Sequence, residues 1–162
     1  MDFTERKQNR IPEYDYGENG AYFVTICTYD REKTLSQIVG DGFPVPKPYG
    51  QIAVEMIQQI SAQYPSVTVD RFVIMPDHIH LLLRFNRNDG TADPSPTLGN
   101  VVGWFKYQVT KKINRQTGSA GMRIFQRSYY DHVIRNQKDY DDIWMYIENN
   151  PKRWVMNKRG YE

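Results

Sequence analysis

The clearest pattern of apolar and polar positions lies in two strand-like runs, Val67–Met75 and His78–Phe85. A Pro-Asp pair, typical of tight turns, separates the runs, so together they predict an antiparallel hairpin. Side chains alternate between the two faces of a strand, which puts His78 and His80 on one face and Ile79 on the other. Two neighbouring imidazoles are half of a metal site, although a strand whose polar positions happen to be histidine would show the same pattern.

The rest of the chain alternates between strand-like and helix-like segments. We expect, in order, a strand over 21–29, a helix over 50–64, the hairpin, a helix from Thr97 to about Arg115, a strand over 130–135, and a helix over 136–150 that Pro151 ends. This order, β-α-β-β-α-β-α, predicts an α+β fold with a ferredoxin-like β-α-β-β-α-β core, an antiparallel sheet and one added C-terminal helix.

The composition is that of one ordinary globular domain, which we expect to span residues 1–162. The aromatic content of 14%, with twelve tyrosines, is generous and makes base stacking a possible use. The single cysteine, Cys27, rules out an internal disulfide and fits a reducing compartment. No apolar stretch approaches the roughly 20 residues of a membrane span, and the opening MDFTERKQNR is too polar for a targeting peptide, so we expect a cytoplasmic protein.

The charge is distributed unevenly along the chain. Residues 1–96 carry 9 Lys and Arg against 13 Asp and Glu, a net −4, whereas residues 97–162 carry 12 against 6, a net +6. A basic half of this kind often marks a surface that binds polyanions, although it is also compatible with an ordinary solvated face. The candidates for phosphate contacts or base stacking are Lys106, Lys111, Lys112, Arg115, Arg123, Arg127, Lys152, Arg153, Trp104 and Tyr107.

The last predicted helix offers a nucleophile and a further metal ligand. In IWMYIENNP, Tyr146 and Asn150 are four residues apart and therefore lie on the same helix face. A phenol and an amide oxygen could then reach one metal site together. The alternative is that Tyr146 merely flanks an apolar stripe and that Asn150 ends the helix before Pro151, and the spacing alone favours this alternative.

Other residues near these motifs have competing interpretations. Asp77 could orient a neighbouring imidazole, but an aspartate in a Pro-Asp turn needs no such role, and the turn role is the safer interpretation. His132 could bind metal or phosphate, and we rank a structural role first. Tyr129 and Tyr130 are rival nucleophiles, but neither has a ligand-type residue four positions on within a helix.

Several separated segments resemble one family. PDHIHLLL, FQRSYYDHVIRN and YIENNP, together with the opening NRIPEYDYGENGAYFVTICTYDRE and the segment TLGNVVGWFKYQVTKKIN, are similar to the single-tyrosine HUH transposases of the IS200 type, especially their REP-associated branch. The resemblance covers nearly the whole chain. It implies that His78 and His80 are metal ligands, that Tyr146 is the nucleophile, and that Asn150 fills a ligand position usually occupied by glutamine in insertion-sequence relatives.

The activity that the resemblance implies is metal-dependent cleavage and rejoining of single-stranded DNA through a 5′-phosphotyrosine intermediate. The implied substrate is a hairpin from a palindromic repeat, the implied metal is Mg²⁺ or Mn²⁺, and the implied state is a monomer or a homodimer. Two imidazole nitrogens would also suit zinc or cobalt. The rival classes are a DNA-hairpin-binding module without catalysis and a metal-dependent hydrolase; neither would form a covalent adduct with DNA.

Overall fold

The computed structural model describes residues 20–86 and 96–158, and residues 9–19 of the opening segment used for the family resemblance lie outside them. In chain order the elements are β1 (Gly20–Cys27), the short 3₁₀ helix η2 (Tyr29–Arg31), β2 (Ser36–Val39), β3 (Phe43–Pro46), α1 (Pro48–Gln58), α2 (Ile60–Gln63), β4 (Val67–Ile74), β5 (His78–Phe85), α3 (Leu98–Thr117), β6 (Tyr130–Ile134) and α4 (Gln137–Lys158).

The main sheet has the strand order β4-β5-β1-β6, and all its neighbouring strands are antiparallel. β5 lies between β1 and β4, so the connection from β1 through α1 to β4 skips one strand, as in the ferredoxin-like arrangement. The predicted α+β fold is therefore confirmed, including its hairpin of β4 and β5 and its added C-terminal helix.

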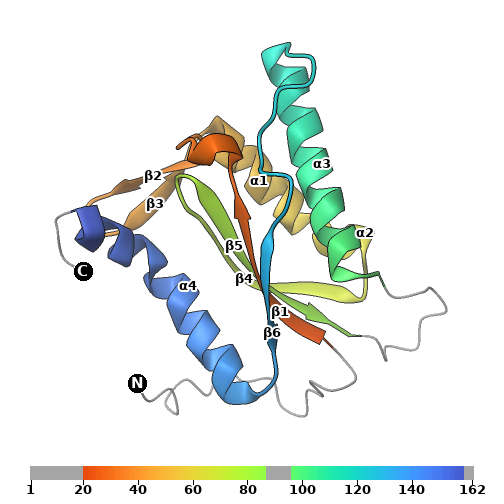
Figure 1. Cartoon of the computed structure of the whole chain (residues 1–162), viewed down its shortest axis with the longest axis vertical. Helices are drawn as coiled ribbons and strands as arrows, with labels where there is room; N and C mark the ends of the chain where they lie inside the picture. Colours follow the sequence, from red (N-terminus) through yellow and green to blue (C-terminus); the bar gives the residue numbers. More distant parts are fainter. Residues whose placement is uncertain (1–19, 87–95, 159–162) are drawn as a thin grey trace.

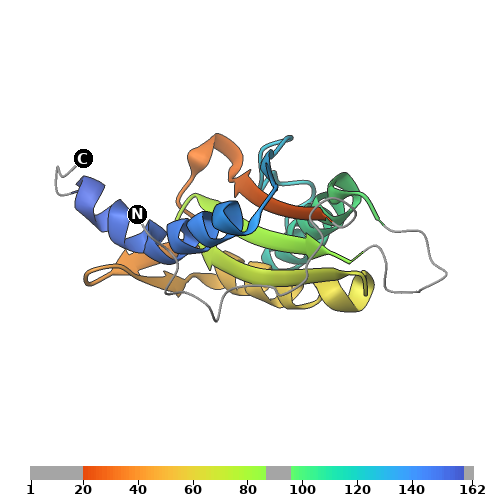
Figure 2. The same ribbon diagram turned by 90° about the horizontal axis from the view of Figure 1, so that it is seen from below.

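Helices cover both faces of this sheet. Figure 1 shows the sheet nearly edge-on, with α1 and α3 on one side and α4 on the other, and Figure 2 shows α4 in front of part of the sheet. Ile79, Leu81 and Leu83 of β5 pack in the larger core, which includes buried residues of α1 and α3. Leu82 lies on the opposite face, in a smaller core with Ile147 of α4. The alternation along β5 therefore places His78 and His80 on the α4 face.

The sequence missed one element and misjudged the end of another. β2 and β3 form a separate two-stranded antiparallel hairpin between β1 and α1. The predicted end of the last helix at Asn150 is wrong, because α4 continues through Pro151 to Lys158. The predicted helix over 50–64 begins at Pro48 and is divided into α1 and α2 at Gln59.

Polar contacts fix one helix on each face of the sheet. Thr97 caps α3 as predicted: its hydroxyl accepts from the Asn100 N–H at 3.0 Å, and the Asn100 side chain accepts from the Thr97 N–H at 3.1 Å. The Tyr140 hydroxyl near the start of α4 donates to Asp70 at 2.7 Å, at the point where β4 has a register shift. This bond ties α4 to the sheet. Within the described ranges, no helix is both long and apolar enough to cross a membrane.

Candidate active site

The two histidines of the His-Ile-His triplet lie side by side on the α4 face of the sheet. Their ring centroids are 4.6 Å apart. The antiparallel register pairs His80 with Thr25 and His78 with Cys27, both on β1, so the β1 side chains that share this face are fixed by the pairing. The predicted orientation of the triplet is confirmed.

Asp77 orients His78. The Nδ1 atom of His78 lies 2.7 Å from Oδ1 of Asp77, and Arg31 Nε donates to the other carboxylate oxygen at 3.2 Å. When Nδ1–H donates to the carboxylate, Nε2 keeps its lone pair and can act as a ligand. Arg31 also donates to the sulfur of Cys27 at 3.2 Å, so this buried cysteine helps to hold the arginine that contacts Asp77. The orienting role of Asp77, set aside above in favour of a turn, is therefore present in the fold.

His80 is held in a different way and is almost completely buried. Only 4% of the residue is exposed, and its Nδ1 lies 2.9 Å from the Thr25 hydroxyl. Its Nε2 is buried and has no hydrogen-bond partner. Burial, followed by the neighbouring charges of His78 and Arg31, lowers the pKa of His80 from 6.5 to about 3. His80 is therefore neutral at pH 7, the form in which an imidazole nitrogen can bind a metal.

Tyr146 approaches these histidines from α4. Its ring centroid lies 5.5 Å from that of His80 and 5.7 Å from that of Phe23, and 37% of the residue is exposed. The Arg153 guanidinium lies 5.4 Å from the centre of the same ring. The tyrosine chosen from the sequence therefore combines access to solvent with a position beside the imidazole pair.

These residues line one pocket of about 300 Å³. Its walls are Phe23, Thr25, Arg31, His78, His80, Tyr130 and Tyr146. Sequence reasoning missed Phe23, Thr25 and Arg31. The first two could be found only from the register of β1 against β5, and Arg31 reaches the site from η2 with a positive φ of 53°. Tyr130 is 66% exposed and shares the pocket, so it stays a rival nucleophile by position.

The other rival residues lie outside this pocket. Tyr129 packs against the larger core, and burial, aided by Asp131, raises the pKa of its phenol. Nε2 of His132 lies 2.8 Å from Asp139, so His132 links β6 to α4, in agreement with the structural role ranked first above.

The donor set fits a divalent cation at the imidazole pair. Nε2 of His80 is buried without a hydrogen-bond partner, and the contact of Nδ1 with the Asp77 carboxylate leaves Nε2 of His78 available. Asn150 is buried one helical turn beyond Tyr146 but is not among the residues that line the pocket. In the described part of the chain, no group of three or more His, Cys, Asp or Glu residues could hold a metal, so the remaining ligands would come from Asn150, water or substrate oxygens.

The predicted DNA contacts on α3 lie across the sheet from this pocket. Lys106 Nζ donates to the backbone carbonyls of Gln126 at 2.6 Å and Arg127 at 3.0 Å, and burial lowers its pKa. Lys112 forms an ion pair with Glu55 at 2.8 Å. Trp104 packs against the larger core, with its ring 6.0 Å from that of Tyr64. These three side chains therefore have structural partners.

The remaining predicted contacts divide between the two faces. Lys111, Arg115 and Tyr107 are exposed on α3, and Arg123 and Arg127 are exposed in the segment between α3 and β6. Lys152 and Arg153 are exposed on α4, where they line a hollow together with Tyr146. Only this last pair lies beside the candidate nucleophile.

The fold and the site together define an α+β domain with a histidine pair and a helical tyrosine in one pocket. The chain belongs to the family of IS200-like transposases, whose pattern matches residues 19–150. An uncharacterised protein of Haemophilus influenzae is 32% identical over 171 residues, covering 94% of this chain and 92% of the relative. A second protein of that species, provisionally named a REP-associated tyrosine transposase, is 28% identical over 156 residues, covering 91% and 76%.

Solved structures show the same fold. A REP-associated tyrosine transposase bound to a REP hairpin aligns with a TM-score of 0.57 at 22% identity, covering 83% of this chain and 68% of that chain. A protein from Deinococcus radiodurans, provisionally described as a transposase, aligns with a TM-score of 0.51 at 18% identity, covering 86% and 95%. At these identities the likeness shows the fold alone. The resemblance to the IS200-type family and its REP-associated branch is confirmed by the family match and the relatives.

Proposed function

We propose that this protein cleaves and rejoins single-stranded DNA beside a hairpin, with Tyr146 as the nucleophile and a divalent cation as the cofactor. The observation that supports this most directly is the shared pocket. An exposed tyrosine on α4 lies 5.5 Å, between ring centroids, from a buried neutral imidazole whose Nε2 has no partner. Membership of a transposase family supports the same class of reaction.

The cation would be held by His78, His80 and Asn150, and Mg²⁺ or Mn²⁺ is the metal we expect. When bound, it would supply Lewis-acid chemistry, polarising a non-bridging oxygen of the scissile phosphate. Asp77 and Thr25 hold the two imidazoles through their Nδ1 atoms, so both rings are oriented by the protein before any ligand arrives.

In the cleavage step the Tyr146 hydroxyl loses its proton to solvent and its oxygen attacks the scissile phosphorus. The bond from phosphorus to the O3′ atom breaks, the leaving oxygen takes up a proton as a free 3′-hydroxyl, and the 5′-phosphate stays on the tyrosine. The guanidinium groups of Arg31 and Arg153, which flank the pocket and the Tyr146 ring, can offset the charge that develops on the phosphate. Attack by a 3′-hydroxyl on the phosphotyrosine reverses the step and rejoins the strand without ATP.

We also propose that the substrate is a DNA hairpin and that the protein acts as a monomer, and a different observation supports each proposal. One solved structure with this fold is described as bound to a REP hairpin, which supports a hairpin as the substrate of this chain as well. Tyr146 and the histidine pair meet within one chain, which supports a site that is complete in a monomer.

The decisive test is a covalent adduct between this protein and DNA. The protein is incubated with a labelled single-stranded hairpin from repeats that flank its own gene, in Mn²⁺ or EDTA, and analysed under denaturing conditions. We expect an adduct that requires Mn²⁺ and is lost in both Tyr146→Phe and His78→Ala. Tyr130→Phe, which removes the other phenol that lines the pocket, is the matched control and should keep the adduct.

Each other outcome favours a different conclusion. An adduct that survives in Tyr146→Phe but is lost in Tyr130→Phe would move the nucleophile to β6. DNA that binds without ever becoming linked would favour a hairpin-binding module. Cleavage that depends on Mn²⁺ but leaves no protein on the DNA would favour a hydrolase that activates water.

A further inference from the structure

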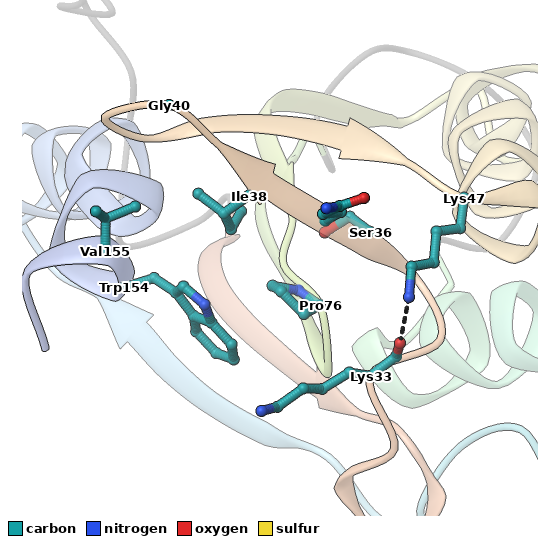
Figure 3. Close-up of a pocket in the computed structure, with 9 residues that line it drawn as sticks. Lys33, Ser36, Ile38, Gly40, Lys47, Pro76, Trp154 and Val155 are labelled. Carbon is teal, nitrogen blue, oxygen red and sulfur yellow. Dashed lines mark hydrogen bonds between the residues drawn. The ribbon is translucent and has the colours of Figure 1, made fainter. Parts of the chain in front are cut away.

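A second and larger pocket lies next to the histidine pair. It has a volume of about 500 Å³, within the range of small-molecule binding sites, and lies between the β2–β3 hairpin and the last turns of α4. Figure 3 shows Trp154 of α4 facing Ile38 and Pro76 across this pocket, with Lys33 extending toward the indole ring. The proposed nucleophile and metal ligands do not line this pocket.

The pocket combines an aromatic face with a positive charge. The Lys33 ammonium lies 5.7 Å from the centre of the half-buried Trp154 ring. Lys47 also lines the pocket, and its Nζ donates to the Lys33 carbonyl at 3.0 Å, which holds the segment that carries Lys33. Within the described ranges no carboxylate lines this pocket and none pairs with Lys33. An anionic ligand with a flat ring therefore complements it.

Trp154 also connects this pocket with the candidate active site. Its ring centroid lies 6.4 Å from that of His78, whose own ring is 4.6 Å from His80. A strand whose scissile phosphate lies at the histidines can therefore place a neighbouring nucleotide beside the indole. Stacking on an aromatic ring with a nearby cation is the usual way in which proteins hold unpaired bases.

We propose that this pocket is a subsite for one unpaired nucleotide of the DNA strand that passes through the histidine site. Its base stacks on Trp154 and its phosphate pairs with Lys33. The inference rests on the proposed DNA-cleaving function and adds a positioning element to it. By anchoring the nucleotide next to the scissile phosphate, the subsite would fix where along the strand Tyr146 attacks.

The test combines abasic DNA with variants of the pocket. Hairpin oligonucleotides with unpaired nucleotides on both sides are made with an abasic site at each unpaired position in turn. Their affinities are measured by fluorescence anisotropy in the Tyr146→Phe background, where our proposal predicts no cleavage. We expect one abasic position to weaken binding by about 5- to 150-fold, the range typical of a stacked base, and this loss to disappear in Trp154→Leu.

The lysine gives an independent readout. Lys33→Ala should reduce the slope of log affinity against log salt concentration by about 0.7, the value for one phosphate contact on a single strand, whereas Trp154→Leu should leave the slope unchanged. The matched control is the corresponding pair on the other face of the sheet, where Lys111 lies 5.8 Å from the centre of the Tyr107 ring. Lys111→Ala and Tyr107→Leu should change neither the abasic profile nor the slope.

Trp154 contributes to the packing of α4, so its variants are checked by thermal unfolding. Trp154→Phe keeps a ring and should retain most of the position-specific effect.

If no abasic position depends on Trp154, or if Lys33→Ala leaves the slope unchanged, the proposed subsite is wrong. An adduct that still forms although no abasic position depends on Trp154 would overturn the subsite alone. A subsite effect without an adduct would overturn strand cleavage alone, and no binding of DNA by the unaltered protein would overturn both.

Discussion

At the scale of single residues, each of the two histidines is oriented by a hydrogen-bond partner at its own Nδ1 atom. Nδ1 of His78 meets the Asp77 carboxylate, and Nδ1 of His80 meets the Thr25 hydroxyl. Both partners therefore leave Nε2 as the available nitrogen on each ring. The contact to the carboxylate is the stronger of the two. Of the two residues that hold the histidine rings, Asp77 is therefore the one on which metal affinity should depend more.

Replacing Asp77 with asparagine should weaken metal binding. An amide is a poorer acceptor than a carboxylate and lowers the basicity of the His78 ring, so Asp77→Asn should bind Mn²⁺ about 10- to 100-fold more weakly in isothermal titration calorimetry. Asp131→Asn, which changes an exposed acid on β6, is the matched control and should bind Mn²⁺ normally. Equal affinity in the two variants would mean that Asp77 serves only Arg31 and the turn.

The buried His80 should make the stability of the protein depend on pH. Its pKa is lowered to about 3 in the folded chain, against 6.5 when unfolded, so between these values the unfolded chain binds more protons. The free energy of unfolding should therefore fall as the pH falls from 6.5 toward 3, with His80 contributing up to about 1.4 kcal/mol per pH unit. Above pH 6.5 this contribution is fully present and constant.

Urea unfolding in EDTA over a pH series measures this contribution. The curve of stability against pH should be flatter for His80→Gln than for the unaltered protein, because the glutamine side chain does not titrate. Parallel curves for the two proteins would show that His80 can be protonated without loss of the fold.

At the scale of elements, the continuation of α4 through Pro151 determines how the site is enclosed. A proline inside a helix removes one hydrogen bond and crowds the preceding turn, at a cost of about 3 kcal/mol. The turns beyond it offset this cost, because Val155 is buried and Trp154 packs against the smaller core. Gly42 in the β2–β3 turn provides the space: a Cβ atom there would lie 2.8 Å from the Lys152 Cα.

Gly42→Ala should therefore displace the end of α4. Gly42 has a φ of +134°, which L residues rarely adopt, and the added methyl group would also meet the α4 backbone. We expect a loss of about 2–3 kcal/mol in urea unfolding and a lower adduct yield. Gly40→Ala, at φ +59° with open space around it, is the control and should lose only about 1–2 kcal/mol. Equal losses would mean that contact with α4 contributes nothing.

The sequence was informative where a pattern is local and silent where tertiary packing decides. The alternation around His78 and the cap at Thr97 depend only on neighbouring residues, and the structure contains both as predicted. The β2–β3 hairpin was missed because its second strand, FPVP, contains two prolines, which are typical of edge strands and loops. The end of α4 was misjudged for a related reason, since its last turns are stabilised by that same hairpin.

The candidate site likewise contains residues that the sequence could indicate and residues that only the tertiary structure brings in. Tyr146 was chosen as the candidate nucleophile through the resemblance to a family, because its spacing from Asn150 alone favoured a structural role. Thr25 and Arg31 could not be identified from the sequence, because they reach the pocket through strand register and through a positive φ in η2.

At the scale of the whole molecule, folding mixes the acidic and basic halves of the sequence. Arg31 and Lys33 come from the half with a net charge of −4, and Lys152 and Arg153 come from the half with a net charge of +6, yet all four lie in or beside the two pockets on the α4 side. The exposed basic residues of α3, Lys111 and Arg115, lie on the opposite face of the sheet. Net charge along the sequence is therefore a poor guide to where basic residues gather in the fold.

This arrangement predicts different effects for two pairs of basic residues. If the cleaved strand follows α4, the double variant Lys152→Ala/Arg153→Ala loses two phosphate contacts, and the slope of log affinity against log salt concentration should fall by about 1.4. Lys111→Ala/Arg115→Ala removes the same charge from α3 and should leave the slope unchanged. Anisotropy measurements with an unpaired oligonucleotide across a salt series check both. A larger change in the α3 variant would place the strand on the helical face opposite Tyr146, where this chain could not cleave it without the tyrosine of a second copy.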